Sequence, residues 1–121
     1  MTCVLVTCSG VSNTGKLTTQ TALALMQRRP GHYVRVDAKQ SAATLEAELA
    51  YADRIIVIDG CRECCATKKM PASPAVPPVH IIATDLGIEK NGMAEVQFHE
   101  IGILADAVRD AENRQQTGSS R

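Results

Sequence analysis

Four cysteines are the residues of this sequence that point most directly to chemistry. Three of them, Cys61, Cys64 and Cys65, lie in the segment IDGCRECCATKK, and Cys8 lies far upstream in VTCSGVSNTGK. Thiolates at such spacings bind zinc and other soft metal ions, or form a redox pair of the C-x-x-C type. Cys3 precedes Cys8 on an extended segment, at a distance of about 16 Å that is too great for a shared metal ion. We therefore expect Cys3 to be a small buried core residue.

The elements that must position these cysteines alternate between strands and helices. Apolar and β-branched runs predict strands at residues 2–7, 32–37, 52–59 and 79–84, with a more exposed fifth at 95–99. Helices are predicted at residues 16–29, 41–51, 61–70 and 101–111. This alternation predicts a three-layer α/β fold: a mostly parallel, flavodoxin- or Rossmann-like sheet of four to five strands in the order 2-1-3-4-5, with helices on both faces. We expect residues 1–111 to form a single domain and residues 112–121 a flexible polar tail.

Such sheets bind ligands beyond the carboxyl ends of their strands, where the strand order reverses. Cys8 follows the first strand and Cys61 follows the third, and these two strands are neighbours in the expected order. Cys64 and Cys65 come three and four positions after Cys61, on one side of the expected helical turn. The sequence therefore predicts a zinc site held by Cys8, Cys61 and Cys65, with Cys64 as the competing third sulfur and Asp37 or water in the fourth position. We also expect the helix N-terminus to lower the pKa values of these thiols.

Besides an interpretation in which the cysteines are structural and the domain is only an interaction module, two other interpretations of these segments remain open. In the first, Cys61 and Cys64 form a reversible disulfide, with Cys8 as a third thiol. In the second, the loop after the first strand binds a small anion or a nucleotide phosphate at a helix N-terminus. The residues of that loop are Ser9, Gly10, Ser12, Asn13, Gly15 and Lys16. The loop departs from the nucleotide-binding pattern G-x-x-x-x-G-K-[ST], because Leu17 stands where the pattern has a hydroxyl.

Composition narrows the classes of partner. The 121 residues include 13 basic and 13 acidic side chains, so no basic excess favours nucleic acid or an anionic membrane surface. The apolar runs are too short to cross a bilayer, and the first ten residues lack the pattern of a signal peptide. We expect a cytoplasmic protein that binds neither nucleic acid nor membrane, in which five cysteines stay free or bind metal. We expect His32, His80 and His99 to be structural or exposed, with His99 the best placed of them to be a ligand.

Three segments, in this order and spacing, resemble the DGC-domain family. They are CSGVSNTGKLT, IDGCRECCATKK and TDLGIEKN, spread over residues 8–91, and the second contains the Asp-Gly-Cys triplet that names the family. The resemblance implies a zinc ion bound by Cys8, Cys61 and Cys65, and it implies no particular reaction. A further cysteine of the family pattern, after the second strand, has no counterpart here, where the sequence reads YVRVDAKQSAAT. This departure implies either an open position in the metal site or a substitute ligand.

Overall fold

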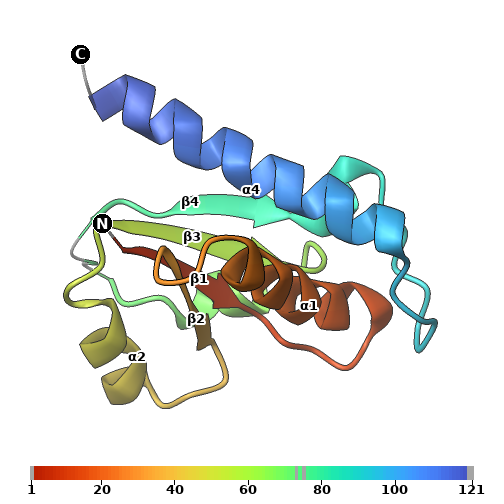
Figure 1. Ribbon diagram of the computed structural model, residues 1–121. Coiled ribbons are helices and arrows are strands. Elements are labelled where there is room, and N and C mark those ends of the chain that lie inside the picture. Colours follow the sequence, from red (N-terminus) through yellow and green to blue (C-terminus); the bar gives the residue numbers. More distant parts are fainter. Residues whose placement is uncertain (1, 73, 75, 120–121) are drawn as a thin grey trace.

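Four parallel strands form the central sheet of the protein (Figure 1). The computed structural model describes residues 2–72, 74 and 76–119. The strands are β1 (Cys3–Thr7), β2 (Tyr33–Asp37), β3 (Arg54–Asp59) and β4 (Val79–Ile82), and they lie in the order β2-β1-β3-β4. β1 and β3 are therefore neighbours, and they end at the same edge of the sheet. The predicted α/β class and parallel sheet are confirmed.

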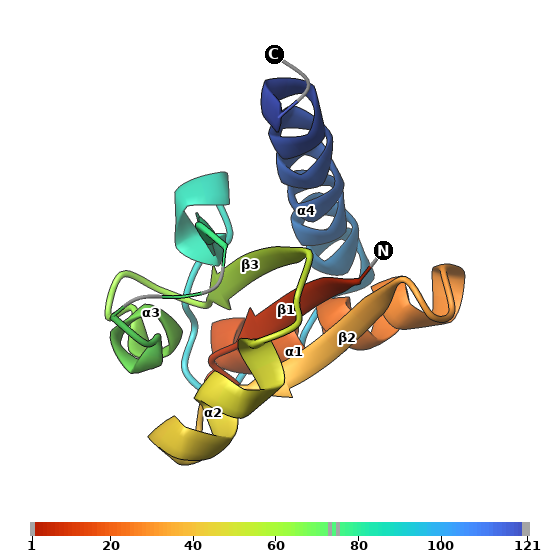
Figure 2. The same cartoon turned by 90° about the vertical axis from the view of Figure 1, so that its left-hand side faces the viewer.

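Helices cover both faces of the sheet and complete a three-layer, Rossmann-like arrangement. On one face α1 (Asn13–Arg28) packs beside α4 (Phe98–Ser119), and on the other lie α2 (Ala42–Leu49) and the short α3 (Cys65–Lys69), as Figures 1 and 2 show. A 3-10 helix, η1 (Ala83–Leu86), follows β4. Within the part of the chain that the structure describes, no helix has the length and hydropathy needed to cross a membrane.

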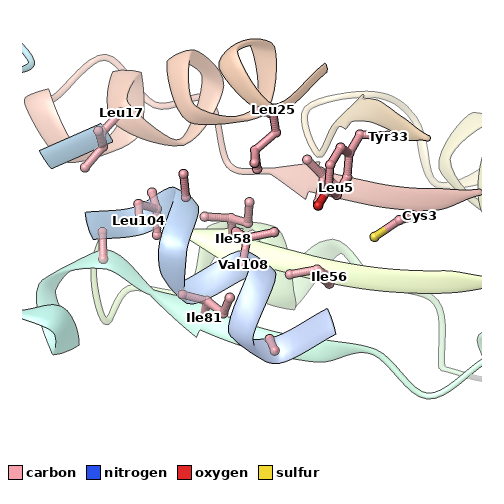
Figure 3. Close-up of a cluster of buried hydrophobic side chains, with 14 of the residues drawn as sticks. Cys3, Leu5, Leu17, Leu25, Tyr33, Ile56, Ile58, Ile81, Leu104 and Val108 are labelled. Carbon is pink, nitrogen blue, oxygen red and sulfur yellow. The ribbon is translucent and has the colours of Figure 1, made fainter. Parts of the chain in front are cut away.

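Alternate residues of the strands pack into two separate apolar layers, because successive side chains of a strand point to opposite faces. The layer under α1 and α4 includes Leu5, Ile56, Ile58, Leu25, Leu104 and Val108 (Figure 3). The layer under α2 and α3 includes Val4, Val6, Ile55, Val57, Leu45 and Leu49. Burial on both faces explains why β1 and β3 are apolar runs rather than alternating ones.

The fifth strand predicted at residues 95–99 is wrong, because this segment leads into α4. Glu100 accepts a hydrogen bond from the backbone N–H of Gln97 through Oε1 (2.8 Å), which is one half of a capping box. The helix therefore begins at Phe98, three residues before the predicted start at residue 101. The amphipathic pattern misses this first turn because Phe98 is 93% exposed and contributes nothing to the apolar face.

α4 also continues past residue 111, where the amphipathic pattern predicts its end. Glu112 is buried and accepts hydrogen bonds from the hydroxyl of Tyr33 (2.7 Å), the guanidinium of Arg54 (3.4 Å) and the ring of His32. Burial alone would raise the pKa of this carboxyl, but the hydrogen bonds from Tyr33 and His32 hold it below its ordinary value. The carboxylate thus ties α4 to the amino ends of β2 and β3. The flexibility of residues 112–121 stays a prediction, and residues 120 and 121 lie outside the described residues.

Candidate metal centre

A pocket of about 500 Å³ lies at the carboxyl edge of the sheet and is lined by four of the five free cysteines. Cys8 follows β1, Cys61 follows β3, and Cys64 and Cys65 lie at the start of α3. The parallel pairing of β1 with β3 places Cys8 and Cys61 at the same edge of the sheet. The backbone N–H of Cys8 donates to the carbonyl of Ile58 in β3 (3.2 Å). Cys3 is fully buried in the core at the other end of β1, as expected.

Asp37 does not join the cysteines. It ends β2, but its carboxylate accepts a hydrogen bond from the backbone N–H of Lys39 (Oδ1, 2.8 Å) and lies 3.5 Å from the guanidinium of Arg35. The two residues that follow it, Ala38 and Lys39, line the pocket in its place. The structure therefore provides a lysine, and not a carboxylate, from the end of β2.

Asp59 organises the segment that carries three of the cysteines. Its buried carboxylate accepts hydrogen bonds from the backbone N–H groups of Ala66 (2.7 Å) and Thr67 (3.2 Å), and from the hydroxyl of Thr67 (2.7 Å). These bonds satisfy the free donors at the N-terminus of α3, so the helix begins at Cys65. The predicted helix over residues 61–70 is therefore wrong at residues 61–64, which form a turn with Cys64 in the left-handed region (φ 54°).

Glycines allow the loops around the pocket to approach one another closely. A Cβ atom at Gly60 would lie 2.7 Å from the carbonyl carbon of Thr14 and 2.9 Å from the amide nitrogen of Gly15. A Cβ atom at Gly15 would in turn lie 2.6 Å from the backbone of Gly10. Both contacts are far shorter than a normal van der Waals contact. The absence of side chains at these positions therefore lets the loop of Cys61 pack against the first turn of α1.

Asn13 attaches a third segment to the same region. Its backbone N–H donates to the carbonyl of Gly92 (2.8 Å), and its side-chain amide donates to the carbonyl of Glu89 (2.8 Å). Its side-chain oxygen accepts a hydrogen bond from the backbone N–H of Asn91 (2.7 Å). These three bonds hold residues 89–92 beside α1, and Lys90 lines the pocket. The three segments singled out in the sequence therefore meet around one pocket.

The predicted anion-binding loop uses several of its donors within the fold. The backbone N–H of Gly15 donates to the side chain of Ser12 (3.3 Å), and that of Lys16 donates to the carbonyl of Ser12 (2.9 Å). The N–H of Asn13 is engaged with residue 92. Of the six residues, three line the pocket, namely Gly10, Ser12 and Gly15, and three do not, namely Ser9, Asn13 and Lys16. The loop contributes mainly shape to the pocket.

Charged side chains of both signs line the pocket, three lysines with the acidic Asp59 and Glu63. Lys39, Lys69 and Lys90 line it, and the ammonium of Lys90 donates to the sulfur of Cys61 (3.7 Å). Partial burial and the nearby Asp59 carboxylate raise the pKa of the Cys64 thiol. The expectation that the helix N-terminus lowers the pKa of these thiols is therefore wrong for Cys64.

The structure also reveals a candidate metal group that the sequence did not predict. Asp59, Cys64 and His80 place a carboxylate oxygen, a sulfur and a ring nitrogen within 4.8 Å of one another. Among the residues described, this is the one set of three or more His, Cys, Asp or Glu side chains at such a spacing. We expected His80 to be structural or exposed. The signal that could have identified it is the pairing of β3 with β4, in which His80 stands opposite Val57 and so faces the same layer as Asp59.

Comparison with known proteins identifies the family. The model of the DGC domain matches residues 4–108. This chain belongs to the DGC-domain family. No curated protein and no solved structure matches it. In this DGC domain the Asp-Gly-Cys triplet has three structural tasks: Asp59 caps α3, Gly60 permits the contact with α1, and Cys61 enters the pocket. The family and the Asp59–Cys64–His80 group are together consistent with metal binding.

Proposed function

We propose that this DGC-domain protein is a cytoplasmic zinc-binding protein, with Cys8, Cys61 and Cys65 as ligands at the carboxyl edge of its sheet. The observation that carries the proposal is the pocket lined by four cysteines from two distant parts of the chain. Thiolate is the donor that zinc takes most readily from proteins, together with imidazole. All five cysteines are free, which suits a reducing compartment.

The donor set suits zinc in its chemistry, and a bound ion would have to draw Cys8, Cys61 and Cys65 together, because their sulfur atoms do not all lie within 4.8 Å of one another. Cys8 and Cys61 are anchored at the ends of adjacent strands, and Cys65 is exposed, which gives a metal ion access from solvent. Three thiolates around a divalent ion carry one net negative charge, which the three lysines of the pocket offset together with its two acidic residues, Asp59 and Glu63. A zinc ion held by three protein ligands acts as a Lewis acid at its remaining position. The pocket, at about 500 Å³, is larger than a metal ion alone requires.

The two alternatives have less support. A redox pair of Cys61 and Cys64, with Cys8 as a third thiol, gives no role to Cys65, which also lines the pocket. An anion site on the loop after β1 needs free N–H donors, and those of Asn13 and Gly15 already have partners within the protein. Metal binding therefore accounts best for the cysteines that line the pocket.

Zinc content after purification in reducing buffer without chelator tests the proposal. We expect Cys8→Ser and Cys61→Ser each to remove one equivalent of zinc per chain, because each substitution removes a thiolate ligand. Cys3→Ser is the matched control, since Cys3 is a buried thiol outside the pocket. X-ray absorption on zinc bound to Cys64→Ser, which keeps the three proposed ligands, should count three sulfur neighbours.

Two outcomes would count against zinc binding by these cysteines. Zinc content unchanged in both Cys8→Ser and Cys61→Ser would refute the proposal. A Cys61–Cys64 disulfide that forms reversibly under mild oxidation, in protein that holds no metal, would favour the redox alternative instead. Mass spectrometry of peptides from the oxidised protein distinguishes these cases.

A further inference from the structure

Asp59, Cys64 and His80 lie together at the end of β3, outside the ligand set proposed above. They come from three segments: the last residue of β3, the turn before α3, and β4. Their ligand atoms lie within 4.8 Å of one another. Ligand atoms bound to one tetrahedral zinc-type ion are about 3.3–3.8 Å apart, because the bonds are about 2.0–2.3 Å long. An ion therefore requires the sulfur of Cys64 to approach by about 1.5 Å at most, while Nε2 of His80 and Oδ2 of Asp59, now 2.9 Å apart, move apart slightly.

The chemistry of these donors selects a class of metal. Carboxylate, thiolate and imidazole together suit zinc, cobalt and nickel, whereas magnesium and calcium take oxygen ligands. One carboxylate and one thiolate also balance the charge of a divalent ion, which matters for a carboxylate as buried as that of Asp59 (1% exposed). We propose that Asp59, Cys64 and His80 bind one divalent transition-metal ion, in a site separate from that of Cys8, Cys61 and Cys65.

The surrounding structure holds the first ligand in place before any metal binds. The carboxylate of Asp59 is fixed by three hydrogen bonds from Ala66 and Thr67 at the start of α3. Its Oδ1 atom accepts the bond from Ala66, and Oδ2 accepts those from Thr67 and the ring of His80 (Nε2···Oδ2 2.9 Å). A metal ion would replace the last of these bonds, which leaves the contacts to α3 intact.

Proton changes on binding are simple. A carboxylate only accepts, so Nε2 of His80 carries the hydrogen in the metal-free pair with Asp59. When Nε2 gives its lone pair to the ion, a ring proton resides on Nδ1. The thiol of Cys64 releases its proton to solvent as the sulfur binds the ion.

The group is also open to solvent. The side chain of His80 is 32% exposed, and Cys64 is half-buried. Asp59 and Cys64 additionally line the pocket that holds the other cysteines. An ion therefore has a path to the three donors from the pocket, and a fourth ligand such as water can reach it the same way.

Cobalt(II) titration of a variant that lacks the other pocket thiols tests this site. In Cys8→Ser/Cys61→Ser/Cys65→Ser, Cys64 is the one pocket cysteine that remains. We expect this variant to bind one equivalent of cobalt, with a thiolate-to-cobalt charge-transfer band in the near ultraviolet. Adding His80→Gln should weaken cobalt binding more than about 100-fold, beyond the 10–100-fold effect of a residue that only orients a ligand. Glutamine keeps a donor for Asp59, so the fold should persist, which circular dichroism checks.

His99→Gln in the same background is the matched control, because His99 is an exposed histidine of α4. It should leave the cobalt affinity unchanged. The inference is overturned if the triple variant is folded and binds no cobalt, or if His80→Gln and His99→Gln bind it equally. The separate zinc site is tested by a different measurement, the loss of zinc from Cys8→Ser in protein that keeps His80.

Discussion

Gly60→Ala should separate the Asp-Gly-Cys turn from α1 and weaken the metal site without removing any ligand. The added Cβ would lie 2.7 Å from the carbonyl carbon and 2.8 Å from the carbonyl oxygen of Thr14, and 2.9 Å from the amide nitrogen of Gly15. These are backbone atoms of a buried helix turn, which cannot rotate away as a side chain can. Gly60 is not among the residues with positive φ, so the substitution tests packing rather than backbone strain.

The size of the effect follows from these distances. An ordinary contact of a Cβ atom is about 3.5–4 Å, so the turn and the helix must move apart by about 1 Å. Overpacking of this kind costs about 1–3 kcal/mol in the free energy of unfolding, which lowers Tm by roughly 5–10 °C for a domain of this size. The same movement shifts Cys61 relative to Cys8, and we expect zinc affinity to fall about 10-fold or more.

Thermal unfolding and competition titration with a zinc chelator measure the two effects. Gly102→Ala is the matched control, because a Cβ atom there meets nothing within 4 Å. Gly102 lies within α4, where alanine should raise stability by about 0.5–1 kcal/mol through helix propensity. If Gly60→Ala is as stable as wild type and binds zinc equally well, the argument that close packing of these loops builds the pocket is wrong.

Three further predictions concern buried polar groups. Because the pKa of Glu112 is held low, its contribution to stability is complete at pH values above the ordinary carboxyl pKa and is lost as pH falls through the folded-state pKa. Glu112→Gln should lower the free energy of unfolding by about 2–4 kcal/mol at pH 7 and make urea unfolding less sensitive to acid. Glu95→Gln, at an exposed residue, should do neither. Asn13→Ala should lower the free energy of unfolding by about 1–3 kcal/mol and speed amide hydrogen exchange at residue 91, because the backbone N–H there loses its acceptor. Asn91→Ala is the control, since it keeps the bond from that N–H to Asn13. Equal exchange in the two variants would contradict the role given to the side chain of Asn13. Burial raises the pKa of Cys3 to about 12, so iodoacetamide at pH 8 should modify exposed residues such as Cys65 and reach Cys3 only after unfolding, as peptide mass spectrometry can show.

Three lysines bring positive charge into the pocket, which the spacing of the cysteines does not predict. Lys39, Lys69 and Lys90 come from three separate segments, and the sequence offers no spacing that relates them. Lys90 reaches Cys61 because Asn13 holds residues 89–92 against the start of α1. The side chain of Asn13, expected to bind an anion, therefore serves the pocket by positioning a loop.

The sequence determined the sheet and the position of its cysteines through patterns that are local. Four consecutive β-branched residues at 55–58 predict a strand buried on both faces, and such a strand implies neighbours and helical layers. Once β1 and β3 are parallel neighbours, Cys8 and Cys61 reach the same edge of the sheet, since Cys8 directly follows β1 and Cys61 stands two residues after β3. A break after each strand is enough to place them.

Tertiary structure alone decided the contacts that depend on register and capping. His80 meets Asp59 across 21 residues, and Glu112 meets Tyr33 across 79, because strand pairing and helix docking set those distances. Asp59 shortened α3 by capping it from β3. Side-chain periodicity reports which face of an element is buried. It carries no information on which polar groups from distant elements will pair, and the pairs made by Asp59 and Asn13 hold the loops of this pocket.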